Sequence, residues 1–175
     1  MDGVVGFYEG TGTDQRGRTL EDVWAFDDHQ LEAVHDIIQW LFPTDRPSAF
    51  NAWAPVLDER SIAELRANPD VPGRLRRSLD RMLLFYGLER STDGPVEIHP
   101  ADSIEIRGPR WWGRGNHNHL RLTRMIMSLG LLGLGDEARA LERALQHVRA
   151  DRATGISDET ARYWAAAARN ADRHV

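Results

Sequence analysis

The stretch from Phe26 to Pro43, FDDHQLEAVHDIIQWLFP, constrains the fold more than any other part of the chain. Its apolar residues recur at the three- and four-residue spacing of a helix, so they share one face. These residues are Leu31, Val34, Ile38 and Leu41. Asp27 and Asp28 are suited to cap the helix because their carboxylates accept hydrogen bonds from free backbone N–H groups, and Pro43 ends it. We therefore predict a helix over residues 28–41 whose apolar face is buried.

His35 lies about 40° from Leu31 around this predicted helix, and therefore on its apolar side. An imidazole buried there without a partner would leave a polar N–H group unsatisfied, which costs about 1–3 kcal/mol. The pattern thus predicts that His35 is buried and hydrogen-bonded.

Apolar residues recur at helical spacing in most of the remaining chain as well. The predicted helices cover residues 19–26, 61–68, 72–86, 116–132, 136–150 and 157–173 in addition to 28–41. The segment 116–132 is apolar nearly all round, which is typical of a helix at the centre of a fold. We predict an all-α protein, a compact bundle of about six or seven helices that forms one domain over residues 1–175.

Three regions are predicted to be irregular. Residues 3–18 are rich in Gly and Asp, with Phe7 and Tyr8 as anchors. The proline-rich loop after Pro43 is expected to fold back through Phe50, Trp53 and Val56. The longest loop lies near residues 89–115, where VEIH and SIEIR alternate in polarity and can pair as a small hairpin.

Composition limits the classes of function. The absence of cysteine excludes disulfides, thiolate metal sites and a catalytic cysteine. The first residues lack the basic and apolar regions of a signal peptide. The longest apolar run, Met125–Leu134, is about half a membrane span. We therefore predict a soluble, cytoplasmic protein with no transmembrane segment. The net charge of −5 argues against general nucleic-acid binding, because phosphate neutralisation supplies most of that affinity.

All 22 cationic residues are arginines, and five of them fall between Ile106 and Gly135, where there is no Asp or Glu. On the predicted helix 116–132, His117, Arg121 and Arg124 lie within about 60° of one another. Cationic side chains on a buried helix must be paired, solvated in a cleft or directed at a ligand. One hypothesis is structural pairing with Asp27, Glu32 or Asp36.

The other hypothesis is a cleft between helices 28–41 and 116–132 that binds a peptide or a small anionic ligand. Trp111 and Trp112 would form the aromatic wall of this cleft. Glycines flank both residues and can supply hinge dihedrals, so we expect them to lie on a mobile loop. Within the cleft we expect Arg121 to face the ligand and Arg124 to be structural. The candidate ligand-binding residues are His35, Trp40, Trp111, Trp112, Asn116, His117, Arg121 and Arg124.

Two further chemistries are weaker alternatives. His35, Asp36, His117 and His119 offer metal-ligand atoms, but on a helix His117 and His119 point about 160° apart. No metal or cofactor is therefore predicted. A hydrolase or lyase could use His35 or His117 as its general acid–base group, since imidazole titrates near neutral pH.

Four separated segments in order, HDIIQWLFP, SAFNAWAPVL, MLLFYGL and HNHLRLTRMI, resemble the opioid growth factor receptor conserved region. The opening FYEG is similar too, so the resemblance runs from about Phe7 into the 140s. It implies binding of an enkephalin-like opioid peptide by a protein associated with nuclear and perinuclear membranes in animals, and it implies no known active site. The 175 residues lack the repeat-containing C-terminal tail of the animal receptors.

Overall fold

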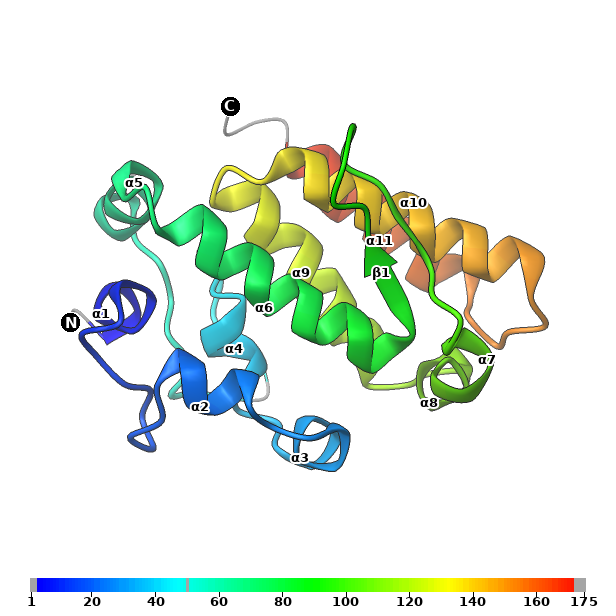
Figure 1. The fold of residues 1–175 in the computed structure, drawn as a ribbon, viewed down its shortest axis with the longest axis horizontal. Helices are drawn as coiled ribbons and strands as arrows, with labels where there is room; N and C mark the ends of the chain where they lie inside the picture. Colours follow the sequence, from blue (N-terminus) through cyan, green and yellow to red (C-terminus); the bar gives the residue numbers. More distant parts are fainter. Residues whose placement is uncertain (1–2, 50, 172–175) are drawn as a thin grey trace. The chain divides into compact units, whose positions relative to one another are not determined.

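The structure is a computed structural model that describes residues 3–49 and 51–171. Eleven helices and one two-stranded sheet occur in these residues, so the prediction of an all-α fold is confirmed (Figure 1). The helices outnumber the predicted six or seven because several are only one or two turns long. The chain divides into two compact units between Ser78 and Leu79. The single domain inferred from the sequence stays a prediction.

The first unit contains five complete helices and the beginning of a sixth. They are α1 (Gly3–Glu9), α2 (Leu20–Trp24), α3 (Asp28–Ala33), α4 (Ile38–Leu41), α5 (Glu59–Ala67) and α6 (Val71–Tyr86), which runs past the division. Large apolar side chains from all of them are buried. The least exposed are Phe7, Tyr8, Leu20, Leu31, Leu41, Phe42, Leu65 and Leu75.

Helix α1 corrects the prediction that residues 3–18 are irregular throughout. Phe7 and Tyr8 are fully buried, as expected of anchors. The Phe7 ring packs edge-to-face on Trp40 with centroids 5.3 Å apart, and the Tyr8 hydroxyl donates to the carbonyl of Leu41. Burial raises the pKa of the Tyr8 phenol well above its usual range. Glycine lowers the helix propensity of this segment, but packing of its apolar side chains outweighs that preference.

The predicted helix 28–41 is interrupted. Helix α3 has the expected cap, because the Asp27 carboxylate accepts a hydrogen bond of 2.7 Å from the backbone N–H of Gln30. The chain then becomes extended at Val34, where φ is −92° and ψ is 99°, and α4 starts only at Ile38. Leu31 and Ile38 are nevertheless both buried. The apolar pattern thus identified the buried residues but not the break.

The loop before α5 also differs from the prediction. Trp53 is 84% exposed and Val56 is 49% exposed, so neither folds back onto the core. Phe50 lies outside the described residues. Helix α5 begins at Glu59 rather than at Ser61, because the Asp58 carboxylate accepts from the Ser61 N–H at 2.8 Å and forms the N-cap.

The second unit contains the rest of α6, a small sheet and five helices. These elements are β1 (Leu88–Arg90), β2 (Ile98–Pro100), α7 (Ile104–Arg107), α8 (Pro109–Trp112), α9 (Asn118–Leu131), α10 (Gly135–Asp151) and α11 (Asp158–Ala171). A small hairpin is present in this region, but the predicted pairing of VEIH with SIEIR is wrong: β2 includes part of VEIH. Its partner is β1, with Leu88 opposite Pro100, whereas the SIEIR segment forms α7.

Helix α9 is the centre of the second unit and packs against both α10 and α11 (Figure 1). Leu122, Met125, Ile126 and Leu129 on α9 are fully buried. Ser157 caps α11, since its hydroxyl accepts from the Thr160 N–H at 3.1 Å. The prediction of a buried central helix in this part of the chain is therefore correct.

Gly87 ends α6 in the left-handed region, with φ of 75°, and a Cβ there would lie 2.9 Å from the Cα of Ile104. Gly94 has a similar φ of 77°, but a Cβ would meet nothing within 4 Å. We expect Gly94→Ala to lower the free energy of unfolding by about 1 kcal/mol, through backbone strain alone. Gly87→Ala should cost about 3 kcal/mol or more, because overpacking adds to that strain. Urea unfolding of both variants tests this, and equal losses would contradict it.

Candidate functional site

The residues predicted to contact a ligand are distributed over both units. His35 and Trp40 belong to the first unit, and the other six belong to the second. Trp40 is buried and contacts Phe7, as described above. His35 is exposed, so the prediction that it is buried is wrong. The helical angle that placed it beside Leu31 does not apply, because the chain leaves the helix at Val34.

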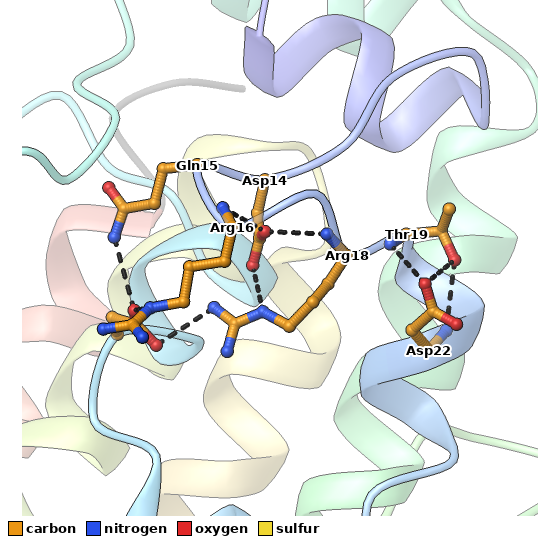
Figure 2. A network of polar contacts seen from close by, with 7 residues as sticks. Asp14, Gln15, Arg16, Arg18, Thr19 and Asp22 are labelled. Atoms are coloured by element: carbon orange, nitrogen blue, oxygen red, sulfur yellow. Dashed lines mark hydrogen bonds and ion pairs between the residues drawn. The ribbon is translucent and has the colours of Figure 1, made fainter.

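Asp36, considered above as a partner for Arg121 or Arg124, pairs with two arginines of its own unit. These are Arg16 and Arg18, which Figure 2 labels together with Asp14. Arg18 joins two carboxylates: its Nε lies 2.5 Å from Asp14 and its Nη2 lies 3.0 Å from Asp36. Arg16 donates to Asp36 as well. Burial alone would raise the pKa of the Asp36 carboxyl, but the hydrogen bonds and charges of Arg18 and Arg16 lower it below its usual range. This network fixes the segment before α2 to the turn before α4.

Trp111 and Trp112 lie on helix α8 rather than on a loop. Trp111 is fully buried, and its indole N–H donates to the carbonyl of Tyr86 at 3.0 Å. Trp112 is half-buried, and its carbonyl accepts from the Gly155 N–H at 2.8 Å. The expected mobile loop is therefore a short helix, and Trp111 is part of the core of the second unit.

The beginning of α9 is held by side-chain amides. Asn116 donates to the carbonyl of Arg110 at 2.7 Å and accepts from the Asn118 N–H at 2.9 Å, so it joins α8 to α9. Asn118 is fully buried and accepts from the Tyr86 hydroxyl at 3.2 Å. His117, at the N-cap position, is exposed.

Arg121 and Arg124 differ in exposure. Arg121 is only 5% exposed, and its Nη1 donates to the Asn118 side chain at 3.4 Å. Arg124 is half-buried, and burial lowers its pKa to about 10, which leaves it charged at neutral pH. The structure thus places Arg121 inside the unit, in a hydrogen-bond network with Asn118 and Tyr86.

His119 is also part of this network. Its Nε2 lies 2.7 Å from the carbonyl of Trp111, so the neutral ring carries its proton on Nε2. Its own carbonyl accepts from the indole of Trp164 at 3.2 Å and from the Thr123 hydroxyl at 2.9 Å. Within residues 3–49 and 51–171, no group of three or more His, Asp or Glu side chains could hold a metal ion.

A surface that the sequence did not predict lies between α10 and α11. Two concavities there, of about 320 and 330 Å³, share Ala165 and so follow one another along α11. The first is lined by Gln146, Arg149, Asp158, Ala161, Arg162 and Ala165. The second is lined by Arg139, Glu142, Arg143, Ala165, Ala168 and Arg169. We call these residues together the α10–α11 groove.

The α10–α11 groove has an excess of positive charge, because five arginines but only two carboxylates line it. Arg139 pairs with Asp136 at 2.6 Å, and Arg149 pairs with Asp158. The remaining three, Arg143, Arg162 and Arg169, are exposed and form no ion pair with any described residue.

The sequence contains a signal for this groove. Arg139 and Arg143 are four residues apart on α10, and Arg162 and Arg169 are seven apart on α11, so each pair shares one helix face. The apolar positions of both helices predict which face of each is buried, but they do not indicate that the two exposed faces lie side by side.

Comparison with known proteins identifies the family. The model of the opioid growth factor receptor conserved region matches residues 12–174.

The chain belongs to this family.

Among its relatives, the opioid growth factor receptor of Homo sapiens is 35% identical over 121 residues, which cover 67% of this chain and 18% of that protein. The opioid growth factor receptor-like protein 1 of Xenopus tropicalis is 33% identical over 120 residues, which cover 67% of this chain and 23% of that protein. The opioid growth factor receptor-like protein 1 of Mus musculus is 31% identical over 134 residues, which cover 75% of this chain and 28% of that protein. No solved structure matches the chain.

The matched region is thus a minor part of the animal proteins, and this member of the family spans about a fifth of the length of the first relatives. None of the helices in the described residues combines the length and the hydropathy that are needed to cross a bilayer.

The pH dependence of stability tests the environment of His119. Burial lowers the pKa of its imidazole below the usual 6.5, although the hydrogen bond to Trp111 opposes this shift. As the pH falls, the unfolded chain therefore takes up a proton first, and the folded state loses stability. His119→Gln retains an N–H donor but cannot be protonated. We expect the wild type to lose more free energy of unfolding than this variant between about pH 7.5 and about pH 5.

Urea unfolding at a series of pH values measures the two slopes. The exposed histidines are present in both proteins, so their titration cancels in the comparison. Parallel slopes would show that His119 is solvated in the folded state.

Proposed function

We propose that this member of the opioid growth factor receptor family is a binding module that takes an acidic peptide in the α10–α11 groove. The names of the relatives describe receptors, which supports a peptide or another small ligand over a reaction substrate. The groove lies wholly within the second unit, on two of its longest helices. Each helix has a rigid backbone, so the arginines project from fixed positions.

The observation that carries this proposal is the row of three exposed arginines without ion pairs along an alanine-lined floor. Guanidinium groups held near one another repel, and an anion placed between them relieves that repulsion. Arginine also binds carboxylates with two parallel hydrogen bonds, which fixes the orientation of the ligand. A peptide carboxylate satisfies both requirements, and the small alanine side chains leave space for its backbone or methyl groups.

The ligand contacts predicted on α9 have a different role in this proposal. Arg121 and Asn118 bond to each other inside the unit, and Trp111 is fully buried. We therefore expect substitution of these three residues to affect the stability of the platform under α10 and α11. A hydrolase or lyase that uses His35 or His117 is not proposed, because both imidazoles are exposed and neither lines the groove.

Fluorescence anisotropy with a labelled Glu- and Ala-rich peptide tests the proposal, with a Gln-for-Glu peptide as the neutral control. We expect the acidic peptide to bind and the neutral one to bind at least about tenfold more weakly, with affinity falling as salt rises. The variant Arg162→Gln/Arg169→Gln should lose about tenfold or more in affinity.

The matched control is Arg46→Gln/Arg60→Gln, which removes two exposed arginines from the first unit and so the same net charge. It should change affinity less than about twofold, since neither residue lines the groove and exposed charges are screened at ordinary salt. Equal affinity of wild type and the groove variant, or equal binding of the acidic and neutral peptides, would refute the proposal.

A further inference from the structure

We infer that the α10–α11 groove selects an α-helical acidic segment whose carboxylates repeat every seven residues. This inference rests on the proposed function and specifies the ligand further. It comes from the placement of the arginines along α11 and from the small residues between them. The ligand would lie along α11, with its carboxylates at the two ends of the groove.

The spacing of the arginines sets the spacing of the ligand's carboxylates. Arg162 lines one concavity and Arg169 lines the other, and they are seven residues apart on one helix. At 1.5 Å per residue this separates their backbone positions by about 10.5 Å along the axis. Ala165 lies between them and lines both concavities. A second helix laid along α11 has the same rise, so carboxylates two turns apart on it match both guanidinium groups.

The floor of the groove favours a helix as the occupant. Ala161 and Ala168 on α11 are buried, and Ala165 is half-buried, so this face has no side chain longer than a methyl group between its arginines. Small residues allow two helices to approach closely, and an amphipathic helix can lay its small or apolar face in such a groove. The floor would contact that face while the arginines bind the carboxylates beside it.

The two ends of the groove differ in available charge. At the second concavity, Arg143 on α10 and Arg169 on α11 both lack an ion pair with any described residue. At the first concavity, Arg149 already pairs with Asp158, so Arg162 is the arginine available there. The end at Arg169 therefore offers two guanidinium groups and the end at Arg162 offers one. This asymmetry gives the bound helix a direction, with its more acidic end at Arg169.

Peptides of equal composition test the inference. Each is a 15-residue Ala- and Gln-rich helix with two Glu residues, spaced either seven or five apart; a five-residue spacing puts them on different faces. We expect the seven-residue spacing to bind about tenfold tighter, and a proline in the middle of that peptide to remove the advantage. Arg162→Gln should abolish the difference between the two spacings, and Arg169→Gln should reduce it less, because Arg143 remains available at that end.

The outcomes separate the two proposals. If both spacings bind equally and the groove variant Arg162→Gln/Arg169→Gln weakens both, the acidic-peptide function stands and the seven-residue helix is refuted. If neither peptide binds, the proposed function itself fails. Tighter binding of a single-stranded oligonucleotide than of any peptide would overturn both, in favour of a polyanion. Both single variants alter exposed side chains, so unchanged thermal unfolding is the expected control result.

Discussion

The second unit depends on the burial of α9, because a helix covered on nearly every side must satisfy its polar side chains from within. Asn118, His119 and Arg121 do this together. Asn118 accepts from Tyr86 and Arg121, while His119 bonds to the carbonyl of Trp111 and accepts the indole of Trp164. These bonds connect α6, α8, α9 and α11. A buried polar group without a partner costs about 1–3 kcal/mol, so the network also specifies how the helices pack.

The same network shows why the role of the arginines of α9 is hard to assign from the sequence. The absence of acidic residues from Ile106 to Gly135 is consistent with either a ligand cleft or internal hydrogen bonding, and charge alone does not distinguish them. Arg121 donates to a neutral amide, that of Asn118, and a search for carboxylates alone does not find such a partner. By contrast, the arginines of α10 and α11 lie on exposed faces, where solvation removes the need for an internal partner.

Residue patterns predicted the helical fold and most of the core, because burial follows the spacing of apolar side chains. The cap at Asp27, the end of α6 at Tyr86 and the central position of α9 followed from local chemistry. The break at Val34 did not, since no glycine or proline marks it. His35 was misplaced for the same reason. The groove was not found either, because it requires the pairing of two helix faces, which only the tertiary structure provides.

The charge of the whole chain limits what the α10–α11 groove can hold. The groove carries an excess of arginines within a protein of net charge −5, so the remainder of the chain is more acidic than the total. Screening confines the attraction to about 8–10 Å at ordinary salt. A long polyanion would extend beyond the groove, and the residues outside the groove have a net negative charge. The balance of charge thus favours a ligand whose negative charges are confined to the arginine row, which is the chemistry of a peptide rather than of a nucleic acid.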